Sequence, residues 1–151
     1  MTDDLLQQAV SDARSVKEQA AFHVGVIGSR SWKNEELLEA FMDKLRTRYG
    51  RFTLVSGGAQ GADTMAAKYV REYEHEVIVY RPDYPKHGNK ATFIRNRQIV
   101  DDCETLISFW DNCSAGSKFT MDFAVDSHIP VFVVEPTGKH YRYFGKYTEG
   151  S

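Results

Sequence analysis

Three short runs of small and hydroxylated residues carry the strongest chemical signal in the sequence. They are Gly28-Ser29-Arg30, Ser56-Gly57-Gly58-Ala59-Gln60-Gly61-Ala62-Asp63 and Asn112-Cys113-Ser114-Ala115-Gly116-Ser117. Glycine lets the backbone turn sharply and approach a ligand closely, and serine hydroxyls and backbone N–H groups donate hydrogen bonds to anions. These runs predict turns that bind a phosphate.

The second run precedes a predicted helix that begins near Ala62. The unpaired N–H groups and positive dipole end of such a helix suit an anion. Asp63 would repel a phosphate placed directly beside it, so we expect Asp63 to cap the turn or to bind a ribose hydroxyl. A glycine turn that only closes a strand–helix junction is the alternative interpretation, as ordinary helix capping is for residues 112–117.

Basic residues accompany these turns. Arg30 can clamp a phosphate or a carboxylate through two N–H groups, or it can be a solvated surface side chain. Between residues 81 and 97 the only acid is Asp83, and the basic residues are Arg81, Lys86, Lys90, Arg95 and Arg97. Most charge runs are solvated surfaces, but this one connects a predicted strand to its helix beside the glycine turns. We therefore favour a role in anion binding.

The elements that position these turns follow from the hydrophobic pattern. Short apolar runs, typical of buried strands, cover residues 23–27, 52–55, 77–80, 105–110 and 131–134. Amphipathic stretches lie between them, and a further helical pattern covers residues 1–20. This alternation predicts an α/β fold: a Rossmann-like doubly wound parallel sheet of about five strands, with helices on both faces and an N-terminal helix. Ligands of such sheets bind at the carboxyl ends of the strands, where the turns lie.

Length and composition narrow the possible functions. We expect an N-terminal helical extension at residues 1–22, one domain at 23–136 and a basic-aromatic tail at 137–151, which packs on the domain or contacts another subunit. The net charge of −2 disfavours a polybasic nucleic-acid binder. No signal peptide or membrane-spanning stretch is apparent, so we expect a cytoplasmic protein.

The histidines and the two cysteines show no metal-ligand spacing, and we expect neither a metal nor a cofactor. Trp32, Trp110 and Tyr84 can stack on a base, although packing is their usual role.

Several motifs in order resemble the SLOG superfamily, which contains the LOG enzymes and DprA, and within it the YspA-like (YpsA-related) branch. The resemblance runs from about Val24 to Val134. It rests on five segments: Val26-Ile27-Gly28-Ser29-Arg30, the run from Ser56 to Asp63, Tyr84 to Ala91, Arg95-Asn96-Arg97, and Phe109-Trp110-Asp111 followed by Ser114-Ala115-Gly116-Ser117.

The resemblance implies a Rossmann-like domain that binds nucleotides or their derivatives. LOG enzymes cleave the N-glycosidic bond of nucleoside 5′-monophosphates with an Arg and a Glu, and the alignment places Arg95 at the catalytic Arg. Lys118, Phe119 and Thr120 stand where the Glu is expected. If this chain is an enzyme, the resemblance leaves Arg95, Asp63 and Asp122 as candidate catalytic residues. It also implies a homo-oligomer.

Three hypotheses follow. The first is binding of a nucleotide-like small molecule, such as a signal derived from NAD or ADP-ribose; the second is LOG-like phosphoribohydrolase activity; the third, disfavoured by charge, is DprA-like binding of single-stranded nucleic acid. The expected ligand-binding residues are Gly28, Ser29, Arg30, Ser56, Gly57, Gly58, Gln60, Gly61, Asp63, Lys90, Arg95, Asn96, Ser114, Gly116 and Ser117.

Overall fold

The computed structural model describes residues 22–145, so the helix expected within residues 1–20 and the end of the expected tail lie outside the described part. A six-stranded sheet has the order β3-β2-β1-β4-β5-β6. The strands are β1 His23–Gly28, β2 Thr53–Ser56, β3 Val77–Val79, β4 Thr105–Phe109, β5 Val131–Val134 and β6 His140–Tyr143. Neighbouring strands from β3 to β5 are parallel, and only β6 pairs antiparallel. The strand order reverses between β1 and β4, which is where open α/β sheets bind ligands.

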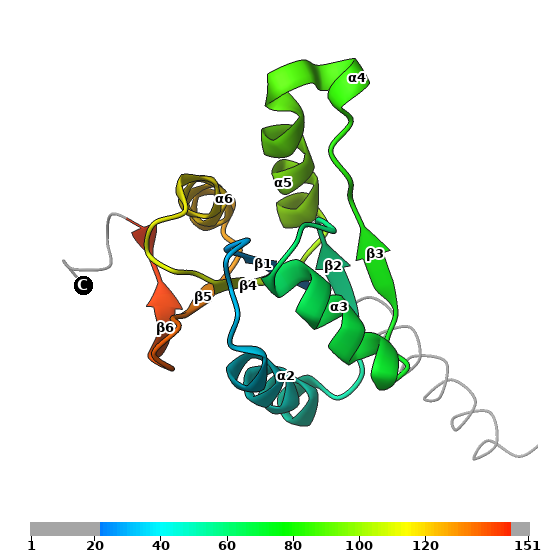
Figure 1. Cartoon of the computed structure of the whole chain (residues 1–151), viewed down its shortest axis with the longest axis vertical. Helices are drawn as coiled ribbons and strands as arrows, with labels where there is room; N and C mark the ends of the chain where they lie inside the picture. The colour runs from blue at the N-terminus through cyan, green and yellow to red at the C-terminus, as the bar shows by residue number, and fades with distance from the viewer. Residues whose placement is uncertain (1–21, 146–151) are drawn as a thin grey trace, which may run out of the picture.

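Helices cover both faces of this sheet. The long helices are α2 Glu35–Tyr49, α3 Ala62–Glu72, α5 Ala91–Asp101 and α6 Ala115–Asp126. In Figure 1, α5 and α6 lie above the sheet, and α2 and α3 lie below it. A short helix α4 (Tyr84–His87) and a 3-10 turn η1 (Gly88–Lys90) lead into α5. This arrangement confirms the expected α/β, Rossmann-like fold. Among residues 22–145, no helix combines the length and apolarity needed to cross a bilayer.

The alternation of side chains along each strand fills two separate cores. Val26 and Leu54 pack into the core between the sheet and helices α2 and α3. Their neighbours Ile27 and Val55 pack into the core between the sheet and helices α5 and α6. Successive residues of a strand point to opposite faces, so a strand covered on both faces is apolar throughout. This is why the strands appear in the sequence as continuous apolar runs.

The expected basic-aromatic tail begins with strand β6, so the sheet has one strand more than the five expected. Tyr143 is buried and its hydroxyl donates a hydrogen bond to Asp122 on α6, while Arg142 is exposed. Residues 140–143 thus alternate between the core and solvent, as an edge strand does. Part of the expected tail is therefore integral to the sheet.

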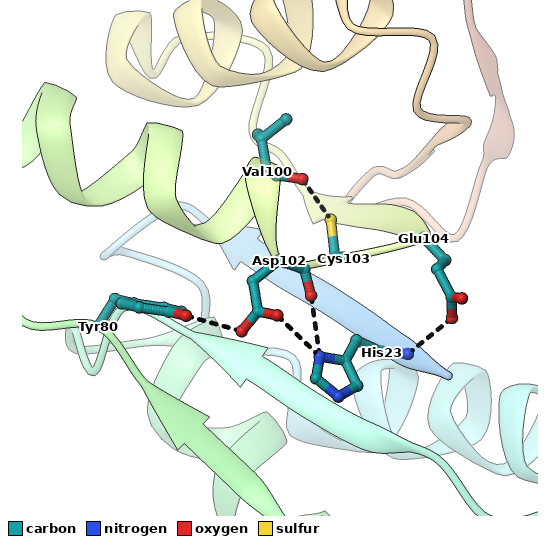
Figure 2. A network of polar contacts seen from close by, with 6 residues as sticks. All are labelled: His23, Tyr80, Val100, Asp102, Cys103 and Glu104. Carbon is teal, nitrogen blue, oxygen red and sulfur yellow. Dashed lines mark hydrogen bonds and ion pairs between the residues drawn. The ribbon is translucent and has the colours of Figure 1, made fainter. Parts of the chain in front are cut away.

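A polar network ties the end of α5 to the strands (Figure 2). The Tyr80 hydroxyl donates to Asp102 Oδ2 at 2.7 Å, and Asp102 Oδ1 lies 3.1 Å from His23 Nδ1 at the start of β1. The backbone N–H of His23 donates to Glu104 Oε2 at 2.9 Å. Cys103, beside this network, is buried, and burial raises the pKa of its thiol to about 12, so the thiol stays protonated. The network fixes the carboxyl end of α5, the helix that carries Arg95.

We predict that Tyr80→Phe destabilises the fold by about 1–2 kcal/mol, because the substitution removes a hydrogen bond to a half-buried carboxylate. Urea denaturation measures the free energy of unfolding. Tyr84→Phe is the matched control, since Tyr84 is 53% exposed. Equal loss of stability in the two variants would show that the Tyr80–Asp102 contact contributes nothing.

Candidate functional site

A cleft of about 430 Å³ opens beside the carboxyl ends of β1 and β4, at the reversal in strand order. It receives residues from the turns after β1, β2 and β4 and from α5. The expected site residues that line it are Gly28, Ser29, Arg30, Asp63, Arg95, Asn96, Ser114, Gly116 and Ser117. The fold thus brings together residues that are up to 89 positions apart in sequence, counting from Gly28 to Ser117.

The glycine run after β2 contributes less to this cleft than expected. From that run only Ala59 and Asp63 line the cleft. The expected site residues that do not line it are Ser56, Gly57, Gly58, Gln60, Gly61 and Lys90. At Gly57 the cause is Arg95, whose side chain lies against this glycine.

Arg95 is buried, with 7% of its surface exposed. Its Nη1 donates to the Gly57 carbonyl oxygen at 2.6 Å, and its Nε donates to Asn96 Oδ1 at 2.7 Å. A Cβ at position 57 would lie 2.5 Å from Nη1, so only glycine leaves room for the guanidinium there. Neither acceptor is a carboxylate, and among the ion pairs of residues 22–145 none includes Arg95. A guanidinium has five N–H donors, so Arg95 keeps donors for an anion in the cleft.

Asp63 is the second buried charged group of the cleft, with 5% of its surface exposed. Its Oδ2 accepts the N–H of Ala59 at 3.2 Å, so Asp63 caps the turn, one of its two expected roles. Its Oδ1 is buried and has no hydrogen-bond partner. Burial raises the pKa of Asp63 to about 6, against the opposing effects of the Ala59 N–H and the charges of Arg95 and Arg30. The cleft therefore holds a carboxyl oxygen that a hydroxyl of a ligand can satisfy.

The third run forms a rigid turn around Asp111. Asp111 Oδ1 accepts the N–H groups of Cys113 at 2.9 Å and Ser114 at 3.0 Å, and the Ser31 hydroxyl donates to Oδ2 at 3.3 Å. Burial acts to raise the pKa of Asp111, but these hydrogen bonds outweigh it and the pKa is lowered. The indole N–H of Trp110 donates to the Ser114 carbonyl at 3.0 Å, so Trp110 supports this turn.

This same turn caps α6. The Ser114 hydroxyl oxygen accepts the N–H of Ser117 at 3.3 Å. No atom outside the local backbone lies within 4 Å of the position that a Cβ would take at Gly116. A ligand can therefore approach the first turn of α6 closely.

Asp122, the other carboxylate considered for catalysis, is not at the cleft. Thr120 lines the cleft, and residues two apart on a helix point in nearly opposite directions. Asp122 instead accepts the Tyr143 hydroxyl and pairs with Lys118 Nζ at 3.1 Å. Asp122 therefore does not share the cleft wall with Arg95.

Seven residues of the cleft wall were not predicted from the sequence: Ile27, Ser31, Ala59, Thr92, Phe93, Asp111 and Thr120. Phe93 differs most from expectation, because 44% of its surface is exposed. Its ring makes an edge contact with Phe119, with centroids 4.9 Å apart and planes at 75°. Trp32, by contrast, is buried against Phe109. Thr92 and Phe93 lie four and three residues before Asn96, so all three share one face of the helix. This spacing was the signal that could have identified Thr92 and Phe93 as residues of the cleft wall.

We predict that Asp63→Asn changes the pH dependence of stability. The folded protein binds the Asp63 proton more tightly than the unfolded chain does, because the pKa rises from 3.8 to about 6. Wild-type stability therefore falls as the pH rises from about 4 through 6, by about 3 kcal/mol from this group. Asparagine removes this loss and can still accept the Ala59 N–H.

Urea denaturation between pH 4 and pH 8 checks this expectation, with the pH range taken from the two pKa values. The difference in unfolding free energy, variant minus wild type, should increase between pH 4 and 6 and stay constant above about pH 7. A difference that does not vary with pH would mean that Asp63 has an ordinary pKa.

Comparisons with known proteins agree with the fold and the motifs. The profile of the YspA, cpYpsA-related SLOG family matches residues 22–87. The chain is 32% identical to the Gene 61 protein of Mycobacterium phage D29 over 114 residues, which cover 70% of this chain and 90% of the phage protein.

Two solved structures share the fold. DprA from Streptococcus pneumoniae has a TM-score of 0.62 at 22% identity, over 75% of this chain and 50% of that one. The second structure is of DprA from Helicobacter pylori and concerns the single-stranded DNA binding mode of that protein. It has a TM-score of 0.61 at 20% identity, over 76% of this chain and 66% of that one. This chain thus spans half to two thirds of these DprA chains. The ordered motifs, the matching profile and the phage relative agree with one another. The chain therefore belongs to the YspA, cpYpsA-related SLOG family.

Proposed function

We propose that the cleft binds a nucleotide or a nucleotide-derived ligand, with the phosphate beside Arg95 and a ribose hydroxyl on Asp63. One observation carries the proposal. The same cleft holds a buried guanidinium and a buried carboxyl oxygen, for which residues 22–145 supply neither an ion-pair partner nor a hydrogen-bond donor. Buried charges in proteins are normally paired, and buried polar atoms are normally hydrogen-bonded. A phosphate and a hydroxyl carried by one ligand would satisfy both.

The surroundings of Arg95 support a phosphate at this position. Arg30 also lines the cleft and adds a second guanidinium. Gly116 and Ser117 lie in the first turn of α6, where backbone N–H groups point out of the helix. A charge-assisted hydrogen bond from a guanidinium and the positive end of a helix dipole both favour an anion.

Phe93 supports a nucleoside rather than a bare sugar phosphate. Its half-exposed ring lies in the cleft wall and is held by the edge contact with Phe119. An aromatic ring fixed in this way offers a flat apolar surface on which a base can stack. Membership of the SLOG family supports the proposal as well, because the family resemblance implies nucleotide binding.

We predict that Arg30→Gln weakens binding of AMP or ADP-ribose by about 1–3 kcal/mol, the range for a hydrogen bond to a charged group. Isothermal titration calorimetry measures the affinity. Lys33→Gln is the matched control, since Lys33 is an exposed cation three residues away that does not line the cleft. The proposal is wrong if neither nucleotide binds the wild-type protein, or if Arg30→Gln binds as tightly as Lys33→Gln.

The two carboxyls of the cleft favour a second candidate, hydrolysis of an N-glycosidic bond. The pKa of Asp63 is raised to about 6 and that of Asp111 is lowered, so Asp63 is the carboxyl of the two that keeps a proton to the higher pH. In glycoside cleavage one carboxylic acid protonates the leaving group, and a carboxylate activates water or stabilises charge at the anomeric carbon. Asp63 would be the acid that protonates the leaving nucleobase, and water would take the place of the nucleobase on the ribose.

We predict that an active enzyme releases free base from nucleoside 5′-monophosphates and that Asp63→Asn abolishes the release while AMP still binds. Chromatography of the products measures the reaction, and Asp122→Asn is the control because Asp122 lies outside the cleft. If the wild-type protein binds AMP and releases no base from any monophosphate, this second candidate is excluded and binding alone remains.

A further inference from the structure

A second cavity lies on the other side of Arg95. Its volume is about 280 Å³, and its walls include Arg81, Lys86 and His87 from the segment between β3 and α5. Arg95 lines both this cavity and the cleft, so its side chain separates the two spaces. Thr92 and Asn96 of α5 border the cleft, whereas Ile94 and Gln98 border the second cavity.

The cations around this cavity are not neutralised by the protein. Among residues 22–145, no ion pair includes Arg81 or Lys86, and no side-chain hydrogen bond uses the guanidinium or the ammonium. The one carboxylate in the wall is Asp83, whose Oδ1 accepts the backbone N–H of Lys86 at 3.2 Å. The Tyr80 hydroxyl, also in the wall, is engaged by Asp102. An excess of unpaired positive charge therefore faces the cavity.

The glycine run after β2 lies next to two residues of this cavity's wall, Val79 and Arg81. Gly58 has a φ of +68°, and a Cβ there would lie 2.9 Å from Val79 Cγ1 and 3.2 Å from Arg81 Nη1. Glycine thus lets the turn bend and lets the guanidinium of Arg81 lie against it. Gly58, which the cleft leaves unused, thus lies against Arg81, a residue of the second cavity's wall.

We propose that the second cavity is an anion subsite that takes a phosphate group through Arg81, Lys86 and Arg95. This inference rests on the proposed function, because Arg95 is the shared wall between the subsite and the nucleotide cleft. It implies a ligand with two anionic groups, such as a pyrophosphate-linked nucleotide, or a nucleotide bound together with a separate inorganic phosphate. The chemistry is the same for both sources: a phosphate oxygen accepting charge-assisted hydrogen bonds.

Titration of the full chain with inorganic phosphate tests the subsite directly, followed by NMR of the backbone amides and the arginine Nε–H groups. Phosphate should shift the signals of Arg81, Lys86 and His87, and the double variant Arg81→Gln/Lys86→Gln should lose these shifts at His87. Lys90→Gln is the matched control, an exposed lysine of the same segment that lines neither cavity. Unchanged phosphate shifts at His87 in the double variant, or their absence in the wild type, would overturn the proposal.

Calorimetry with AMP and ADP-ribose separates the two sources of the phosphate. If one ligand occupies both cavities, the double variant should bind ADP-ribose about tenfold or more weakly and AMP as the wild type does. If a separate phosphate occupies the subsite, both nucleotides should bind the double variant as before, while the phosphate shifts are lost. Failure of AMP and ADP-ribose to bind the wild type would reject the nucleotide cleft but leave the phosphate titration as an independent test of the subsite.

Discussion

The burial of one guanidinium is the constraint on which the rest of the site depends. Arg95 extends from α5 against the glycine turn and gives hydrogen bonds to a carbonyl and an amide oxygen, but among residues 22–145 to no carboxylate. A buried positive charge without an ion pair is costly, and Asp63, whose pKa burial raises to about 6, compensates it through its charge. A ligand that places a phosphate beside Arg95 and a hydroxyl on Asp63 would lower the cost of both groups, which gives the protein a physical reason to bind one.

The fold makes this burial possible by bringing three turns to one place. Reversal of the strand order between β1 and β4 leaves a crevice outside their carboxyl ends, and the turn after β2 lies next to them. The N–H of Ser29 donates to the Phe109 carbonyl at 2.9 Å, which joins the turns after β1 and β4. The polar network at Asp102 holds the carboxyl end of α5 (Figure 2). The hydrogen bond from Arg95 to the Gly57 carbonyl holds the middle of this helix against the turn after β2.

Much of this could be predicted from the sequence, for reasons that particular residues make clear. Residues 131–134 are apolar throughout because the strand is covered on both faces, and this pattern predicts β5 without ambiguity. Residues 140–143 alternate between core and solvent with cations on the outer positions, a weaker pattern, and strand β6 was missed. The motif at Gly57 was recognised, but composition could not show that the space beside this glycine is filled by Arg95 from a helix far along the chain. Phe93 was missed because an aromatic residue on an amphipathic helix normally packs in the core.

A crystal structure of the full chain with bound AMP tests the central claim most directly. We expect the phosphate to lie in the cleft within hydrogen-bond distance of Arg95 and the first turn of α6, with a ribose hydroxyl on Asp63 Oδ1. A nucleotide bound elsewhere on the protein, with Asp63 Oδ1 still lacking a partner and no anion beside Arg95, would contradict the account.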